Sequence, residues 1–380
     1  MKKIKLTIVL AAIACGLALS LSYSQQPQKK LAKIQEYMDD AAKEKLVGVS
    51  IYIKSPKLGT WVGTSGYSNL EQKTPLDKDN IFGLASIGKM YIAVAVLKLV
   101  QDGKIGLDDK IEKYLPQEII EGFPTAKDVT VRNLLGHTSG LYNYNRNPKL
   151  NELYLTGNLK LDTLSHMDAL RDYAYGITEH TKPLGEYKYS STNYLLLSMI
   201  MDKVVPEGHS SYMRKELIEK YGLKDTYYKE TPPERLVEHY GDINEDGITE
   251  NLSAETIETT NWYSGDDGVY STVEEASRFL QKLMNGEILN ENTLKEMMTW
   301  NDEKNPDYGL GLMADKSFPY KFLMGHSGRG IGITTDLYYF PKQDMTVAIF
   351  SNSGLRSASK DYGKVYFKMR KRIIKKLFLF

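Results

Sequence analysis

Two residues near the start of the chain, Ser86 and Lys89, have types and a spacing that could do chemistry together. In the first turn of a helix, side chains three residues apart lie on one face, so Lys89 can reach the Ser86 hydroxyl. A serine hydroxyl is a poor nucleophile until a neighbouring group removes its proton, and a desolvated lysine can do this. The unpaired N–H groups at the helix start can also stabilise an oxyanion. The spacing therefore permits nucleophilic catalysis through Ser86.

The same segment, GLASIGKM, also approximates a phosphate-binding loop, with four residues between Gly83 and Gly88-Lys89. That interpretation fails because Met90 stands where such a loop carries the hydroxyl that holds Mg²⁺. The preceding residues, DKDNIF, are also too polar for a buried strand. A second Ser-x-x-Lys sequence at 357–360 shows that the motif alone has little weight. The rest of the chain must show whether this segment holds a catalytic nucleophile.

Strand patterns lie near both ends of the chain, and helical patterns lie between them. Residues 48–54 and 60–66 are typical of short strands joined by a Pro/Gly turn, and residues 330–340 and 345–352 are typical of a hairpin. Apolar residues recur at helical spacing over 85–101. These patterns predict an α/β fold, with a central, mainly antiparallel sheet built from both chain ends, flanking helices and an inserted, mostly helical subdomain.

The first 24 residues are predicted to be an export signal. Lys2, Lys3 and Lys5 precede an apolar run over 6–21, and Ser22-Tyr23-Ser24 offers a small-residue cleavage site. We therefore expect a periplasmic or extracellular protein, with lipid attachment at Cys15 as the alternative. Cys15 is the only cysteine, so the mature chain would have neither disulfides nor a catalytic thiol.

The mature chain, 25–380, is predicted to be one catalytic domain. Residues 25–80 and 262–380 would form its sheet-containing part, and 81–261 its helical part. The charge is balanced, with 49 Lys and Arg against 48 Asp and Glu, so we expect no nucleic-acid partner. No stable membrane span is expected.

The last 17 residues combine an apolar face with many cations. Val365, Met369, Ile373 and Leu377 are four residues apart, which predicts a closing helix packed on the sheet. The alternative is a helix that contacts a membrane surface peripherally.

Six sequence blocks, in order, cover most of residues 45–355 and resemble the class C β-lactamase and DD-peptidase family of penicillin-recognising serine hydrolases. They are IFGLASIGKMYIAVAVLKLVQDGKIGLDDKIEKYLP, VRNLLGHTSGL, KPLGEYKYSSTNYLLL, GDDGVYSTVEEASRFL, YGLGLM and GHSGRGIGITT. The resemblance implies a β-lactamase/transpeptidase-like fold. It also implies that Ser86 and Lys89 are the catalytic pair, and that Asp266-Asp267-Gly268 lies on the rim of the cleft.

The family's second catalytic element is Tyr-x-Asn, and Tyr189-Ser190-Ser191 stands in its place. The resemblance implies that Tyr189 shares proton transfer with Lys89. Ser191 is a departure, because the family's Asn amide bridges the lysine and the substrate's amide carbonyl. A serine is shorter and offers one hydroxyl instead of an amide's donors and acceptor. The change weakens the case for amide or β-lactam turnover more than for ester turnover.

The third element is Lys/His-Thr/Ser-Gly on a strand that lines the cleft, and His326-Ser327-Gly328 stands in its place. The resemblance implies that His326 orients substrate or tunes the catalytic tyrosine, with Ser327 and Gly328 at the substrate. If unperturbed, His326 would titrate near pH 6.5. The backbone N–H groups of Ser86 and Arg329 would form the oxyanion hole. His137, by contrast, is predicted to be a structural histidine.

Together these features predict an exported serine hydrolase that works through a Ser86 acyl-enzyme. The expected substrates are D-amino-acid peptides of the cell-wall type, such as peptidoglycan stem peptides, or small esters and amides. An esterase, a β-lactamase, or a catalytically weakened binding protein with Ser191 as its cause are the alternatives. No cofactor or metal is expected. Residues 242–247 copy half of a calcium loop, but Ser253 replaces the Glu such a loop needs.

Overall fold

The computed structural model describes residues 27–155, 160–232, 234–244, 246–302, 304, 307–316, 322–354 and 360–378. The predicted export signal and most of the second Ser-x-x-Lys sequence lie outside these ranges. Within them, no helix combines the length and the apolar character needed to cross a membrane.

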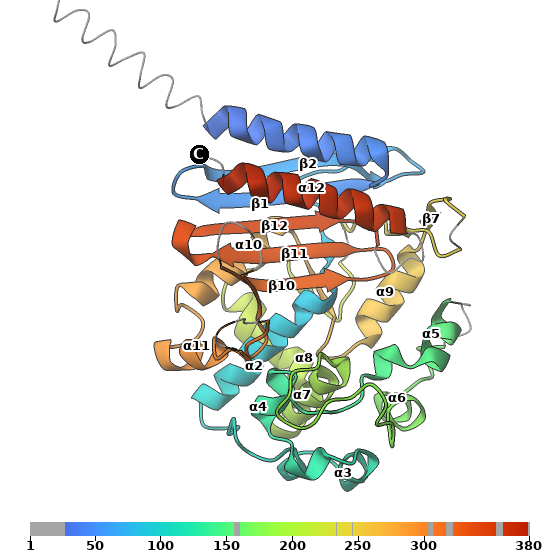
Figure 1. The fold of residues 1–380 in the computed structure, drawn as a ribbon, viewed down its shortest axis with the longest axis vertical. Helices are drawn as coiled ribbons and strands as arrows, with labels where there is room; N and C mark the ends of the chain where they lie inside the picture. Colours follow the sequence, from blue (N-terminus) through green and yellow to red (C-terminus); the bar gives the residue numbers. More distant parts are fainter. Residues whose placement is uncertain are drawn as a thin grey trace, which may run out of the picture.

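A seven-stranded antiparallel sheet forms the frame of the molecule (Figure 1). Its order is β3-β2-β1-β12-β11-β10-β9. The strands are β1 (Gly48–Ser55), β2 (Gly59–Asn69), β3 (Thr74–Pro75), β9 (Met313–Asp315), β10 (Leu323–Arg329), β11 (Thr334–Phe340) and β12 (Met345–Ser351). The two chain ends meet where β1 pairs with β12, from Val49 opposite Ser351 to Lys54 opposite Thr346. The predicted sheet, built from both ends and including the β11–β12 hairpin, is confirmed.

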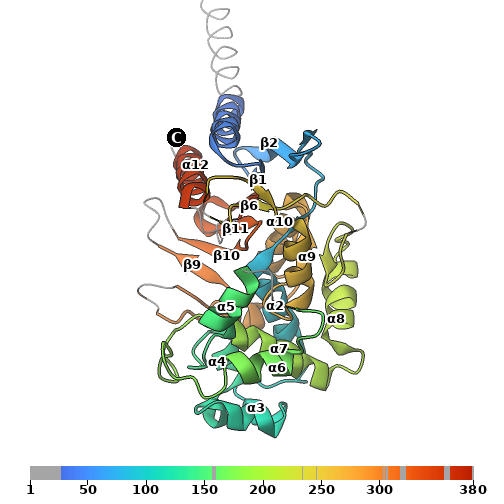
Figure 2. The same cartoon turned by 90° about the vertical axis from the view of Figure 1, so that its right-hand side faces the viewer.

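Two helices cover one face of this sheet: the helix over residues 27–44 and α12 (Lys360–Phe378), which lie side by side in Figures 1 and 2. The α12 side chains Val365, Met369, Ile373 and Leu377 are buried in a cluster with the sheet. The predicted closing helix is therefore confirmed. Because the sheet covers this apolar face, a peripheral membrane contact of α12 would use its exposed basic side, and this alternative stays a prediction.

The helical part lies on the other face and extends away from the sheet (Figure 2). At its centre, α2 (Gly88–Gln101) is buried from Gly88 to Leu99, which explains its apolar run. The other α-helices are α3 (Gln117–Gly122), α4 (Val131–Leu135), α5 (Pro148–Leu155), α6 (His166–Tyr173), α7 (Ser191–Val204), α8 (Gly208–Tyr212), α9 (Ser253–Trp262), α10 (Val273–Met284) and α11 (Glu291–Met297). A π-helical segment, η5 (Met213–Glu219), continues α8.

Two small sheets complete the fold: β4-β8-β5, with β4 (Phe82–Gly83), β8 (Val269–Ser271) and β5 (Tyr227–Tyr228), and β6-β7, with β6 (Tyr240–Gly241) and β7 (Glu250–Asn251). The pairing of β4 with β8 brings the turn that holds Ser86 beside the turn that holds Asp266. A Cβ added to Gly88 would lie 3.0 Å from the Asp267 carbonyl oxygen, so these two turns are in close contact.

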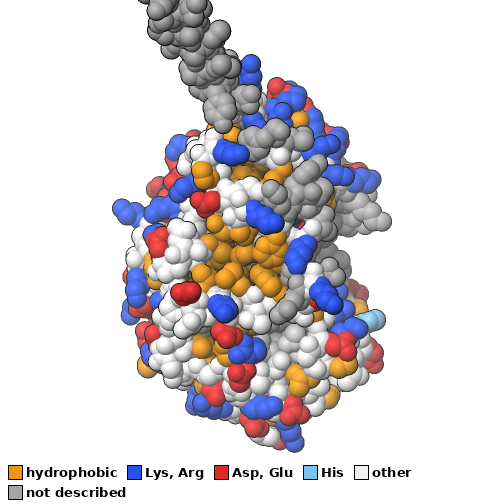
Figure 3. Space-filling model, turned by 60° about the vertical axis from the view of Figure 1, so that its left-hand side comes forward, with side chains coloured by type: hydrophobic (Ala, Val, Ile, Leu, Met, Phe, Trp, Pro, Cys, Tyr) orange, Lys and Arg blue, Asp and Glu red, His pale blue; other side chains and the backbone are white. Residues whose placement is uncertain are grey.

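Charge is not segregated on the face drawn in Figure 3. Lysine, arginine and acidic side chains intermingle there around a central apolar area.

Candidate active site

Ser86 lies in a short 3₁₀ turn, η1 (Ala85–Ile87), that leads directly into α2. The preceding residue, Ala85, has a φ of 49°, a left-handed conformation that costs free energy for a residue with a Cβ. The Lys89 Nζ lies 3.2 Å from the Ser86 Oγ. The predicted contact between lysine and serine is therefore present in the structure.

Lys89 is fully buried, and its ammonium group has several partners. Nζ donates to the Asp266 backbone carbonyl at 2.9 Å and lies 3.8 Å from the Asp266 Oδ2. It also lies 5.2 Å from the ring centroid of Tyr189 and 5.8 Å from that of Tyr194. These contacts orient the Lys89 side chain toward Ser86 and place Tyr189 beside Lys89.

Tyr189 precedes α7 and packs against a cluster of rings. Its ring centroid lies 4.2 Å from that of His137, 6.0 Å from that of Tyr308 and 6.4 Å from that of His326. The structure therefore brings the four predicted catalytic residues together, although they come from η1, α2, the segment before α7 and β10.

The His326 side chain is fully buried and lies near Tyr189, and it is not among the side chains that line the pocket. Its Nδ1 lies 2.8 Å from the Ser327 carbonyl, which can only accept, so Nδ1 carries the proton. Nε2 then accepts from the Tyr308 hydroxyl at 3.0 Å. Burial, with a smaller contribution from the positive charge of Lys89, lowers the pKa of His326 to about 3. The expected titration near pH 6.5 is corrected accordingly.

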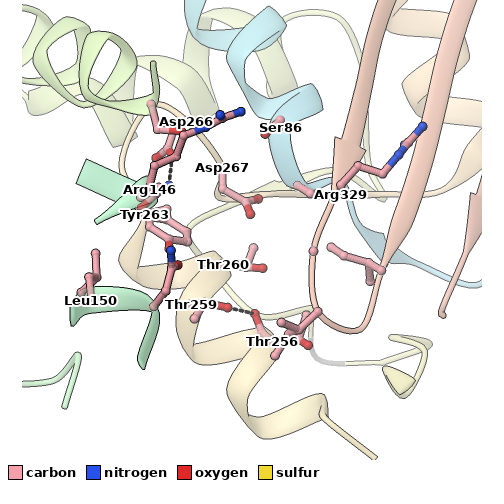
Figure 4. A pocket seen from close by; sticks show the side chains of 17 residues that line it. Ser86, Arg146, Leu150, Thr256, Thr259, Thr260, Tyr263, Asp266, Asp267 and Arg329 are labelled. Atoms are coloured by element: carbon pink, nitrogen blue, oxygen red, sulfur yellow. Dashed lines mark hydrogen bonds between the residues drawn. The ribbon is translucent and has the colours of Figure 1, made fainter. Parts of the chain in front are cut away.

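Successive residues of strand β10 point to opposite faces of the sheet. The Gly328 Cα faces the nucleophile turn so closely that a Cβ there would lie 2.2 Å from the Leu84 carbonyl oxygen. The side chains of Ser327 and Arg329 point to the opposite face, where Ser327 contacts the Met313 sulfur and Arg329 pairs with Asp336 at 2.7 Å. Figure 4 shows the Arg329 side chain turned away from Ser86. Any substrate contact from Ser327 or Arg329 would therefore use backbone groups.

A pocket of about 410 Å³ opens beside Ser86 (Figure 4). Its volume lies in the range typical of small-molecule sites. Asp266, Asp267 and Arg146 lie on the same side of the pocket as Ser86, while Thr256 lies at the far end from it. Of the three residues that the resemblance places on the cleft rim, Asp266 and Asp267 line the pocket, and the Asp266 side chain is buried.

Ser191 lines this pocket as the first residue of α7. It interacts with the Asp266 carboxyl group, whose pKa is raised by burial, against an opposing effect of Lys89. The Asn145 Nδ2 donates to the Asp266 Oδ2 at 3.2 Å. The contact of Asp266 with Lys89 was not predicted from the sequence. The only available signal was a pair of adjacent acids in a Gly-bounded turn.

The prediction of a structural His137 is consistent with its position below Tyr189. His137 is fully buried, and its Nδ1 accepts from the Ser190 backbone N–H at 3.2 Å. The same nitrogen lies 3.2 Å from the Asn193 amide nitrogen, and the Asn193 Oδ1 accepts from Ser139 at 2.6 Å. Asn193 is therefore committed to this network and does not take the place of an amide at position 191.

The fold and the family together define a serine hydrolase of the β-lactamase class. A model of the Beta-lactamase family matches residues 32–365, and the chain belongs to this family. It is similar to penicillin-binding protein 4* of Bacillus subtilis (strain 168), with 25% identity over 81% of this chain and 68% of that protein. It is also similar to protein flp of Staphylococcus aureus (strain N315), with 27% identity over 54% of this chain but only 39% of that protein.

Solved structures have the same fold. A D-amino acid amidase from Ochrobactrum anthropi SV3, complexed with D-phenylalanine, superposes with a TM-score of 0.77 at 24% identity, over 92% of this chain and 99% of that one. EstCE1, a hydrolase with promiscuous acyltransferase activity, superposes with a TM-score of 0.69 at 20% identity, over 90% of this chain and 98% of that one.

Proposed function

We propose that this protein is an exported hydrolase of D-amino-acid peptides of the cell-wall type, or of small amides and esters, that works through an acyl-enzyme on Ser86. The observation that carries the proposal is the 3.2 Å contact between the Lys89 Nζ and the Ser86 Oγ beside an open pocket. The similarity to a penicillin-binding protein and the fold of a D-amino acid amidase support this class of substrate.

The reaction has two halves. In acylation, the neutral Lys89 amine takes the Ser86 proton while Oγ attacks the substrate carbonyl. Tyr189 gives its hydroxyl proton to the leaving group and recovers a proton from Lys89. The backbone N–H groups of Ser86 and Arg329 hold the oxyanion. Water then gives a proton to the Lys89–Tyr189 pair as it attacks the ester, and the pair returns this proton to Ser86 Oγ as the acid product leaves. His326 remains neutral and supports Tyr308 in the ring cluster behind the site.

A substrate panel tests the proposal. Purified protein is assayed against a D-Ala-D-Ala peptide, D- and L-phenylalanine amide, a p-nitrophenyl ester and a penicillin, with Ser86→Ala as the control. The proposal predicts turnover of at least one D-configured amide or peptide that is lost in Ser86→Ala. Turnover of the ester alone favours the esterase alternative, and rapid hydrolysis of penicillin favours a β-lactamase.

A binding protein with weakened catalysis is the second candidate, and Ser191 is the observation that favours it. It predicts saturable binding of a D-Ala-D-Ala peptide, measured by calorimetry, with no turnover of any panel member. Turnover at the rates of an ordinary enzyme would rule it out.

A further inference from the structure

Lys89 has a buried carboxyl partner that the acylation scheme leaves unused. The Asp266 Oδ2 lies 3.8 Å from Nζ, and the same residue's carbonyl accepts from Nζ at 2.9 Å. Lys89 is fully buried, and Asp266 is 3% exposed. Buried charges are costly unless they are paired, so each of these groups depends on the other.

The Asp266 carboxyl is held in place by its surroundings. Asn145 donates to Oδ2, and Ser191 interacts with the group from the start of α7. The turn itself is fixed, because Gly265 has a φ of 80° and a Cβ there would lie 2.0 Å from the Tyr194 carbonyl oxygen. Only glycine can adopt this backbone conformation so close to α7, and the turn therefore holds Asp266 near α7 and Lys89.

Besides Lys89, the described titratable groups that interact electrostatically with Asp266 include His166 from α6 and, around β5, Tyr228 and Lys229. Burial lowers the pKa of Lys229 and of His166 and raises that of Tyr228. Burial also raises the pKa of Asp266 itself, which favours its protonated form.

We propose that Asp266 positions Lys89 and stores its proton, and that with Ser191 it replaces the amide that position 191 lacks. After Nζ and Oδ2 approach from 3.8 Å to hydrogen-bond distance, one N–H bond of the Lys89 ammonium breaks and one O–H bond forms on Asp266, which leaves the amine that takes the Ser86 proton. The pair has the same total charge before and after the transfer, so burial does not oppose it. The small Ser191 side chain leaves room for the carboxyl group. The inference rests on the proposed role of Ser86 and Lys89.

The pH dependence of Ser86 labelling by a fluorophosphonate tests the proton store without any substrate. In the wild type, the Asp266 carboxyl group sets the pH below which the labelling rate falls (the acid limb), because a protonated carboxyl group cannot accept the proton of Lys89. In Asp266→Asn, Lys89 must release its proton to water. We expect labelling near pH 7 to slow at least about tenfold and the acid limb to move to higher pH. Asp162→Asn, the same change at an exposed turn residue, should match the wild type.

The direction in which the acid limb moves in Asp266→Asn distinguishes the proton-storing role of Asp266 from a purely structural one. An acid limb that stays in place while the rate falls would mean that Asp266 is merely structural, and would overturn the proposal. A limb that moves to lower pH would also overturn it, since the carboxylate would then only hold Lys89 in its charged form.

Position 191 provides the second test. Ser191→Asn should slow labelling when Asp266 is present, because the larger amide competes for the space of the carboxyl group. In the Asp266→Ala background it should speed labelling. Independent effects at the two positions would contradict the claim that they act as one unit.

A third test measures thermal unfolding and does not depend on the reactivity of Ser86. Lys89→Met and Asp266→Asn should each lower the thermal unfolding midpoint, and the double variant should lower it by less than the two shifts combined. Additive shifts would overturn the pairing. Wild-type protein that resists labelling would contradict the proposed function, while this cycle would still decide the Asp266–Lys89 pairing.

Discussion

At the scale of single residues, the site depends on which side chains are buried and with which partners. The sequence motif correctly predicted that Lys89 reaches Ser86, because a three-residue spacing on a helical turn is a local property. The burial of His326 and the Asp266–Lys89 contact could not be predicted this way. The latter joins residues 177 positions apart and depends on how two turns pack.

The hydroxyl of Tyr189 is expected to contribute directly to the reaction. Tyr189→Phe keeps the ring that packs against His137 but removes the proton donor. We expect kcat/KM to fall by about 10²- to 10⁴-fold, the usual contribution of general acid–base catalysis. The matched control is Tyr187→Phe, two residues earlier, whose ring stacks on Tyr308. Equal activities of the two variants would contradict the role of Tyr189.

His326 should not control the pH dependence near neutrality. Its pKa of about 3 keeps it neutral across the range in which a free histidine titrates. Any acid limb of the labelling rate near pH 6.5 should therefore persist in His326→Gln. Disappearance of such a limb in that variant would show that the histidine titrates in the working site.

At the scale of elements, a buried carboxylate joins β10, β11 and α12. Asp336, on β11, is fully buried and pairs with Arg329 at 2.7 Å and with Arg370 at 3.0 Å, and it accepts from the Tyr366 hydroxyl at 2.9 Å. The closing helix thus fixes Arg329, whose backbone N–H is a proposed oxyanion donor. The sequence predicted α12 from its periodicity, but it gave no sign of this connection.

Asp336→Asn should destabilise the protein strongly. Neutralising the buried carboxylate leaves two partly buried guanidinium groups without their counter-ion, and the cost should approach the roughly 3–5 kcal/mol typical of a broken buried pair. Urea unfolding measures the loss. Asp344→Asn is the control, since Asp344 has a φ of 44°, which asparagine tolerates well. A loss of less than about 1 kcal/mol in Asp336→Asn would contradict the importance of this cluster.

The longer elements were predictable and the shortest were not. Alternation and apolar runs located β1, β2, α2, β11 and β12 to within a few residues. Strands β4 and β8, of two and three residues, are too short to leave a periodic pattern, yet their pairing sets the distance between Ser86 and Asp266.

At the scale of the whole molecule, buried neutral histidines make stability depend on pH. Burial lowers the pKa of His239 and His326 to about 3 and that of His137 well below its ordinary value. Unfolded histidine titrates near 6.5, so between those values the unfolded chain binds protons that the folded chain does not. The free energy of unfolding should be highest above pH 6.5 and fall toward pH 3, by up to about 1.4 kcal/mol per pH unit for each histidine.

His239→Leu isolates one of these contributions. Neither ring nitrogen of His239 has a hydrogen-bond partner among the described residues. Between pH 7.5 and 5, the free energy of unfolding measured in urea should fall by about 2 kcal/mol less than in the wild type, with most of the difference below pH 6.5. The exposed His180→Asn should leave the slope unchanged. Identical slopes for His239→Leu and the wild type would contradict the prediction.

The most direct test of the whole account is intact-mass spectrometry of the purified protein after treatment with a fluorophosphonate, followed by peptide mapping. The account predicts one adduct, located on Ser86, and no adduct in Ser86→Ala. A folded wild-type protein that remains unmodified, or that is modified at another serine, would contradict the claim that Lys89 activates Ser86 as the nucleophile.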